Sequence, residues 1–243
     1  MSLTKPCLVM DGDDTLWVNA WKYYRVEKMI LRFLIEIFQL KSDLKEFRQH
    51  ALAVQDRIDT NNVEKYGLGK DRFPISWVEA YRELCREKGT KPKKSYEQKI
   101  FSLAAKFWEP PFLFFRGVRS TLRELRRRGY RLILLTAGDH EVQRFKINYL
   151  KVGRYFDRLI VVPKSKELTL RRLARKFGHR NVVMIGDSKR SDMGAAIKVK
   201  MRGIFIPHRE NDWSYQNLDC PAAIWEKYIH QIEEFGQLLD LFP

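Results

Sequence analysis

The chain of 243 residues contains few cysteines and no long uninterrupted apolar segment. Its three cysteines, Cys7, Cys85 and Cys220, are too widely spaced to indicate a zinc site or a disulfide framework, so a reducing cytosol is the expected location. The most apolar stretch, residues 29–40, includes two charged residues and is too short to span a bilayer. The sequence therefore predicts a cytoplasmic protein with no membrane segment.

Acidic residues are also scarce relative to basic ones. Lys and Arg total 46 against 30 for Asp and Glu, which gives a formal net charge of +16. Such a field attracts anions, for example phosphorylated metabolites, nucleic acid or acidic surfaces. The basic residues are concentrated in 122–131 and 170–180, where apolar residues are interleaved as on amphipathic helices. Solvated outer helix faces are the favoured interpretation, and an anionic or nucleic-acid partner is the alternative.

One region of the chain has a helical pattern throughout, from residue 17 to residue 111. Within it, Ser76 and Ser95 are each followed three residues later by Glu or Gln, the spacing of a capping box, which predicts that helices begin at these serines. The region ends at two consecutive prolines, which cannot continue a helix. The helices expected here cover about 21–40, a segment after Ser42, 76–89 and 95–108.

The rest of the chain, residues 1–16 and 112–243, alternates short apolar strands with helices as far as residue 207. Continuous apolar strands are typical of a parallel sheet covered on both faces, and the alternation predicts a doubly wound, Rossmann-like α/β core. The region 17–111 is then an all-helical cap domain inserted after the first strand. The expected strands are 7–10, 130–136, 158–162, 181–186 and 203–207; a helix is expected over 222–239, and Trp213 could pack under the sheet or form an interface.

Polar residues follow the strands of this predicted core. Asp11 and Asp13 follow the first strand, Thr136 ends the second, and Asp187 ends the fourth, with Asp192 five residues further on. In an open α/β sheet, ligands bind outside the carboxyl ends of the strands. These side chains are therefore expected to converge on one crevice.

The stretch from Cys7 to Trp17 runs from four apolar residues directly into three carboxylates, Asp11, Asp13 and Asp14. Isolated carboxylates there would repel one another and lose solvation, whereas Mg²⁺ takes hard oxygen ligands and tolerates close carboxylates. One carboxylate could form an aspartyl-phosphate, and a second could protonate the leaving oxygen and later deprotonate water. Mg²⁺, a lysine, a hydroxyl and backbone N–H groups could hold the phosphoryl oxygens.

Four segments together resemble the motifs of the haloacid dehalogenase (HAD) superfamily: DGDDTLW, LILLTAG, a lysine after VV, and GDSKRSD. Their order and their placement at strand ends match as well. The resemblance covers about 1–16 and 112–207, and the inserted helices look like the mobile cap of the C1-capped group. It implies a Mg²⁺-dependent phosphatase that acts through an aspartyl-phosphate on a small phosphorylated metabolite.

The resemblance also implies a role for each matched residue. Asp11 matches the nucleophile, and Asp13 matches the general acid/base, whose backbone carbonyl is expected to touch the metal. Asp14 is assigned to local structure and Asp139 to a helix N-cap. The other matched positions are Thr136 and Ala137 for phosphate binding, Asp187 as the carboxylate that completes the Mg²⁺ site with Asp11 and Asp13, and Asp192 in support of that site.

Two lysines compete for the motif position, Lys164 and Lys166. Family members usually carry a glycine about fourteen residues after this lysine, and Gly178 lies at that distance from Lys164. Lys164 also follows the third strand more closely, so the strand-end rule favours it. Lys166 remains the alternative.

The resemblance leaves several reactions open. In the family's dehalogenases the position matching Asp13 is not an aspartate and no metal is needed, so phosphoryl transfer is the expected reaction. A phosphatase acting on nucleotides or nucleic-acid ends is one alternative, and a phosphomutase on the same residues is another. The non-enzymatic alternative is a nucleic-acid-binding protein that uses the +16 surface.

Overall fold

A computed structural model describes residues 5–207 and 217–243, so Trp213 lies outside the described residues. The chain forms two compact units, one of Met1–Asn19 with Phe112–Pro243 and one of Ala20–Pro111. The first boundary thus lies three residues after the expected one. Trp17 is fully buried in the hydrophobic core of the first unit, which explains why the chain leaves that unit only after Asn19.

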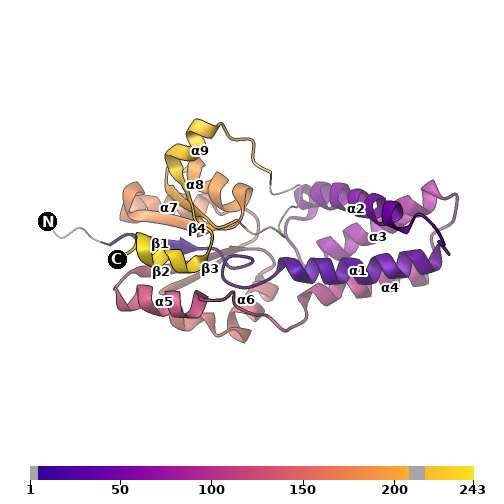
Figure 1. The fold of residues 1–243 in the computed structure, drawn as a ribbon, viewed down its shortest axis with the longest axis horizontal. Helices are drawn as coiled ribbons and strands as arrows, with labels where there is room; N and C mark the ends of the chain where they lie inside the picture. The colour runs from indigo at the N-terminus through magenta and orange to yellow at the C-terminus, as the bar shows by residue number, and fades with distance from the viewer. Residues whose placement is uncertain (1–4, 208–216) are drawn as a thin grey trace. The chain divides into compact units, whose positions relative to one another are not determined.

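The first unit (Figure 1) is called the core unit below. It is built on a six-stranded sheet in the order β3-β2-β1-β4-β5-β6, with every neighbouring pair parallel. β1 lies between β2 and β4, and its last residue, Met10, is level with Leu134 and Ile185. The carboxyl ends of these three strands are therefore side by side. The strands are β1 Cys7–Met10, β2 Arg131–Ala137, β3 Arg158–Val162, β4 Val182–Gly186, β5 Arg202–Phe205 and β6 Ile229–Gln231.

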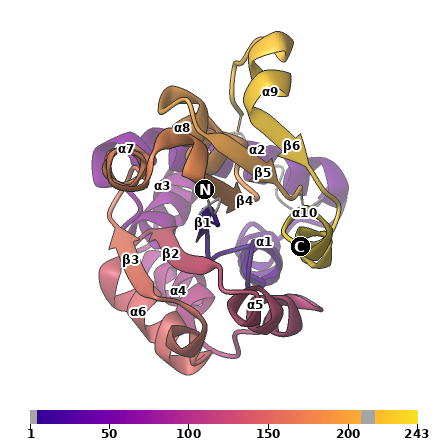
Figure 2. The same ribbon diagram turned by 90° about the vertical axis from the view of Figure 1, so that its left-hand side faces the viewer.

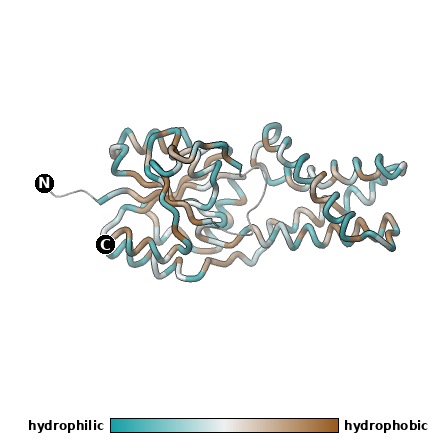
Figure 3. Tube along the Cα trace, turned by 45° about the horizontal axis from the view of Figure 1, so that its top comes forward, coloured by the Kyte–Doolittle hydropathy of each residue, from teal (hydrophilic) through white to brown (hydrophobic). Residues whose placement is uncertain are grey.

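Helices cover both faces of this sheet, as the doubly wound prediction requires (Figure 2). Alternate residues of β1 point to opposite faces: Leu8 and Met10 pack with α5, α6 and α10, whereas Cys7 and Val9 pack with α7 and α8. Hydrophobic residues are accordingly concentrated along the strands (Figure 3). The helices are α5 Val118–Arg127, α6 His140–Tyr149, α7 Glu167–Phe177, α8 Gly194–Lys198, α9 Ala222–Tyr228 and α10 Leu238–Leu241.

The single helix expected over 222–239 is wrong, because α9 ends at Tyr228 and the chain continues as strand β6. β6 pairs with β5 and buries Ile229, while Ile232 bonds to the carbonyl of Phe205. The edge of β5 offers unpaired backbone groups, and pairing with them outweighs a local helical pattern.

The second unit, called the helical unit below, contains four α-helices: α1 Ala20–Ile37, α2 Leu44–Tyr66, α3 Arg72–Glu87 and α4 Lys94–Ala105. α3 begins four residues before the expected Ser76, whose hydroxyl donates to the Arg72 carbonyl inside the helix. A buried ion pair between Arg72 and Asp59 of α2 fixes this earlier start, and Pro74 fits in the first turn, where no backbone donor is needed. Among the described residues, no helix is both long and apolar enough to cross a bilayer.

The basic segment 122–131 lies mostly on α5. Its apolar residues Leu122 and Leu125 are buried against the sheet, and several of its arginines have partners within the chain. Arg127 and Arg128 pair with Glu124, and Arg128 also donates to two backbone carbonyls near the C-terminus, at 2.7 and 2.6 Å. Some of the positive charge in this segment is therefore paired within the chain and stabilises the folded core unit.

Candidate active site

The carboxyl ends of β1, β2 and β4 bring most of the predicted site residues together. Asp11 directly follows β1, and its backbone N–H donates to the Ile185 carbonyl of β4 at 2.9 Å. Thr136 is the penultimate residue of β2 and is fully buried. Asp187 directly follows β4, so the three side chains share one edge of the sheet.

A buried acidic cluster forms at this edge. One carboxylate oxygen from each of Asp11, Asp187 and Asp192 lies within 4.8 Å of the others, and all three residues are at most 7% exposed. Burial raises the pKa of Asp11 to about 7, and the Asp192 carboxylate adds to the rise. Burial, followed by the charges of Asp14 and Asp11, raises the pKa of Asp187 well above its ordinary value. Hard oxygen donors that repel one another fit a Mg²⁺ ion, since a divalent cation would relieve the repulsion.

The structure places Lys166 at the site, and the preference for Lys164 is corrected. The Lys166 side chain is 2% exposed; its Nζ donates to Asp11 and, at 2.5 Å, to Asp192. Burial lowers the pKa of Lys166, but the carboxylates of Asp11 and Asp192 outweigh burial, so the pKa is raised. Lys164 is exposed. The strand-end rule favours Lys164, the first lysine after β3. In the structure three residues form the turn that follows β3, and Lys166, directly before α7, is the lysine whose side chain reaches the site.

Asp192 is held on the π-helical turn Lys189–Met193. Its carboxylate accepts the Ser188 backbone N–H at 3.0 Å in addition to the Lys166 ammonium. Gly186 packs so closely on this carboxylate that an added Cβ would overlap it. The Asp192 carboxylate is thus held in a fixed position beside those of Asp11 and Asp187.

Thr15, for which the sequence predicted no role, joins the two acidic loops. Its hydroxyl donates to Asp187 Oδ1 at 2.9 Å and accepts the Asp187 backbone N–H at 3.0 Å. The hydroxyl therefore aligns the Asp187 carboxylate with the loop that carries Asp11. Thr15 lies within the DGDDT segment, but the hydrogen bonds join it to a residue 172 positions away, so no local pattern in the sequence indicates them.

Thr136 supplies a hydroxyl that has no hydrogen-bond partner among the described residues, although it is fully buried. Such a hydroxyl is free to donate a hydrogen bond to an anion bound at this end of the sheet. The backbone of Gly12 lies next to it, since a Cβ on Gly12 would come within 3.2 Å of Thr136 Oγ1. Ala137, the other predicted phosphate-binding residue, is the last residue of β2 and directly follows Thr136.

The remaining predicted residues take distinct positions. The side chain of Asp13 is 22% exposed, and its carboxylate accepts hydrogen bonds from Trp17, Gln143 and Lys146. Asp14 is buried and accepts the Asn19 backbone N–H at 2.7 Å, a local structural role. Asp139 caps α6 by accepting from the backbone of Glu141 and Val142, which confirms the predicted N-cap.

Replacing Gly12 with Ala is expected to destabilise the core unit by about 1–3 kcal/mol, because an added Cβ would overlap the fully buried ring of Trp17. Gly153→Ala is the matched control: a Cβ there would lie 3.5 Å from the Leu159 side chain, an ordinary contact, so its effect should stay within about 0.5 kcal/mol. Urea unfolding of both variants measures the difference. Equal stability of the two would contradict this packing around Gly12.

A family comparison decides the classification of the chain. Residues 6–200 match the family of haloacid dehalogenase-like hydrolases, a span that contains every residue of the candidate site. This protein is a haloacid dehalogenase-like hydrolase. No curated protein matches this HAD hydrolase.

Solved structures share its fold. A HAD-like family hydrolase from Xanthomonas campestris is 24% identical with a TM-score of 0.74, covering 98% of this chain and 94% of its own. A HAD hydrolase from Bacillus subtilis bound to magnesium is 15% identical with a TM-score of 0.60, covering 98% of both chains. A predicted phosphoglycolate phosphatase from Haemophilus somnus is 14% identical with a TM-score of 0.59, covering 100% of both. These likenesses establish the HAD fold for this hydrolase.

Mg²⁺ is expected to raise the melting temperature of this HAD hydrolase more at about pH 8 than at about pH 5.5. The folded-state pKa of Asp11 is about 7 against 3.8 for an unperturbed group, so between these values the folded state binds more protons. The contribution of Asp11 to the stability of the metal-free protein therefore falls as pH rises through this window. Metal and protons compete for the same oxygens, so the benefit of Mg²⁺ is largest where Asp11 is ionised.

Thermal unfolding with Mg²⁺ and with EDTA at the two pH values measures this effect. Asp187→Asn, which removes one carboxylate of the cluster, is expected to reduce the Mg²⁺-dependent shift at both pH values. A shift of the same size at both pH values in the wild type would speak against a metal site at Asp11.

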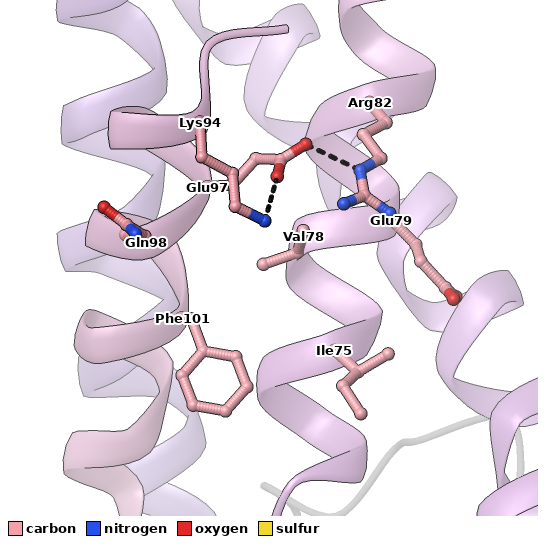
Figure 4. A pocket seen from close by; sticks show the side chains of 8 residues that line it. All are labelled: Ile75, Val78, Glu79, Arg82, Lys94, Glu97, Gln98 and Phe101. Carbon is pink, nitrogen blue, oxygen red and sulfur yellow. Dashed lines mark hydrogen bonds and ion pairs between the residues drawn. The ribbon is translucent and has the colours of Figure 1, made fainter.

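A groove of about 360 Å³ lies between α3 and α4 in the helical unit of the HAD hydrolase (Figure 4). Ile75, Val78 and Phe101 form its apolar side, and Glu97 pairs with Arg82 at 2.7 Å and with Lys94 at 3.4 Å. None of the residues that the HAD motifs single out lines it. Its charges satisfy one another, so the groove is not a candidate catalytic site.

Proposed function

We propose that this HAD hydrolase is a Mg²⁺-dependent phosphatase of the C1-capped group. It would hydrolyse a small phosphorylated metabolite through an aspartyl-phosphate. The observation that carries the proposal is the arrangement around Asp11: a buried ammonium on one side and the partnerless hydroxyl of Thr136 at the adjacent strand end. A carboxylate that must attack a phosphoryl group needs both positive charge and hydrogen-bond donors for the phosphoryl oxygens.

The chain's own residues account for both halves of the reaction. An oxygen of Asp11 attacks phosphorus, the bond from phosphorus to the leaving oxygen breaks, and Asp13 gives that oxygen a proton. Asp13 then takes a proton from a water molecule that attacks phosphorus, which releases inorganic phosphate and restores Asp11. Lys166, the Thr136 hydroxyl and the Ala137 backbone N–H are assigned to the phosphoryl oxygens.

Asp11, Asp187 and the backbone carbonyl of Asp13 would hold the Mg²⁺ ion, with Asp192 in support. When bound, the ion supplies positive charge that offsets the charge on the phosphoryl group and on the carboxylates. The raised pKa values of Asp11 and Asp187 support this assignment, because burial first and neighbouring carboxylates second disfavour their charged forms, and a bound cation would offset both effects.

Asp13 favours phosphoryl transfer over dehalogenation. Halide leaves as an anion and needs no proton, whereas an alkoxide leaving group does, and an acid positioned two residues after the nucleophile meets that need. A phosphomutase would use the same residues and would also have to exclude water while its substrate reorients. Release of inorganic phosphate distinguishes the two reactions.

Hydrolysis of p-nitrophenyl phosphate, with Mg²⁺ and with EDTA, tests the proposal. We expect release of phosphate in Mg²⁺ and its loss in EDTA. A panel of phosphorylated metabolites, nucleotides and 5′-phosphorylated oligonucleotides then measures which class of substrate the enzyme hydrolyses fastest. Activity on metabolites but not on oligonucleotides would support the small-substrate assignment. A folded protein that is silent on the whole panel in Mg²⁺, with no phosphoryl group trapped on Asp11, would overturn it.

A further inference from the structure

The carboxylate of Asp13 is held by three side-chain donors from two segments of the core unit. Trp17 Nε1 donates to Oδ1 at 2.5 Å, and Gln143 Nε2 donates to Oδ2 at 2.7 Å. Lys146 Nζ donates to both oxygens, at 2.7 and 3.0 Å. Three donors on one carboxylate fix the plane and the direction of the group.

Lys146 is an unusual residue to find in this position. Its side chain is fully buried, and its Nζ also donates to Asn19 Oδ1 at 3.0 Å. Burying an ammonium costs several kcal/mol of desolvation free energy unless it is paired and hydrogen-bonded. A hydrophobic residue at this position of α6 would be buried without that cost. The side chain has two kinds of acceptor here, and one of them is the residue assigned as general acid/base.

Gln143 and Lys146 lie three residues apart and so share one face of α6, together with the buried Val142 and Ile147. The Gln143 amide also donates to the Ala137 carbonyl at 3.3 Å, and its side chain fills the space where a Cβ on Gly138 would lie. Through Gln143, the end of β2 that carries Thr136 is therefore connected to Asp13. Gln143 thus connects Asp13 through hydrogen bonds to the end of β2, which carries the predicted phosphate-binding residues, and Lys146 donates to Asp13 from the same helix.

We propose that Lys146 is a positioning residue that holds Asp13 oriented for proton transfer, with Gln143 as its neutral partner. The inference rests on the proposed phosphatase function. In this arrangement Lys146 is assigned no contact with the phosphoryl group or the leaving oxygen; it acts through Asp13, whose carboxylate it keeps in one orientation with the exposed part left for the leaving oxygen. Proton transfer depends on a heavy-atom distance of roughly 2.6–3.2 Å, so an Asp13 carboxylate free to rotate would spend much of its time out of reach.

The test compares a substrate that needs a general acid with one that does not. In Lys146→Met, which keeps the length of the side chain and removes its donors, kcat/KM for an alkyl phosphate is expected to fall at least about tenfold more than kcat/KM for p-nitrophenyl phosphate. p-Nitrophenolate is a good leaving group and needs little protonation. Arg144→Met is the matched control, because it removes one positive charge from the exposed face of the same helix and should change neither value.

Two further variants separate positioning from folding. Gln143→Leu removes one donor without removing a charge, and it is expected to shift the same substrate ratio in the same direction. In the Asp13→Asn background, Lys146→Met should add less than about twofold, since residues that act through one another are not additive. If Lys146 had only a structural role, Lys146→Met would lower kcat/KM for both substrates by the same factor. Its effect would then multiply with that of Asp13→Asn in the double variant.

The outcomes distinguish this inference from the proposed function. A wild type that hydrolyses neither phosphate overturns the phosphatase proposal and, with it, the role of Lys146. Two results with an active wild type would overturn the role of Lys146 alone. In the first, Lys146→Met lowers kcat/KM for both substrates by the same factor. In the second, the effects of Lys146→Met and Asp13→Asn multiply.

Discussion

Asp11→Asn is expected to lower phosphatase activity at least about a thousandfold while leaving the fold intact. An amide does not form an acyl phosphate, so the first step of the reaction has no nucleophile. Hydrolysis of p-nitrophenyl phosphate in Mg²⁺ measures the loss, and circular dichroism checks the fold.

Asp139→Asn is the control for the loss of a carboxylate near the same loops. Asn is also a good N-cap, so the hydrogen bonds to the backbone of α6 should survive and activity should stay close to that of the wild type. If Asp11→Asn retained more than a few per cent of the activity, a residue other than Asp11 would have to be the nucleophile.

Lys166→Met is expected to cost about 3–5 kcal/mol of unfolding free energy in the absence of Mg²⁺, because it leaves Asp11 and Asp192 buried without their cation. Activity should fall at least about a hundredfold, since the phosphoryl oxygens lose a fixed positive charge. Urea unfolding in EDTA and steady-state kinetics in Mg²⁺ measure the two effects.

Lys164→Met is the matched variant two residues away. Lys164 is exposed, so its replacement should change stability by less than about 0.5 kcal/mol and leave activity close to wild type. The difference in stability and activity between Lys164→Met and Lys166→Met therefore tests the assignment of Lys166 to the site. A larger loss in Lys164→Met than in Lys166→Met would reverse it.

The parts of the site that lie on the ends of strands could be predicted from the sequence. Asp11, Thr136 and Asp187 each end or follow a continuous apolar run, and parallel strands place such residues at one edge of the sheet. The helical region could be predicted as well, because its periodicity differs from that of the core. The start of α3 does not follow from the local sequence, because the buried Arg72–Asp59 pair places it ahead of the capping-box serine.

The parts that could not be predicted depend on contacts between distant segments. Choosing Lys166 over Lys164 requires the length of the turn between β3 and α7, which no local pattern gives. The strand β6 forms because β5 has a free edge. Gln143 and Lys146 lie more than 120 residues from Asp13 along the chain, and only the packing of α6 reveals their hydrogen bonds to it.

Trapping a phosphoryl group on Asp11 is the sharpest test of Asp11 as the nucleophile. The Asp13→Asn variant is mixed with p-nitrophenyl phosphate and Mg²⁺, quenched in acid and digested, and its peptides are weighed by mass spectrometry. Loss of the base slows hydrolysis of the intermediate, so we expect a phosphoryl group on the peptide that contains Asp11. It should be absent when Asp11 is also replaced by Asn. A variant that still releases p-nitrophenol but carries the phosphoryl group elsewhere, or nowhere, would contradict this role of Asp11.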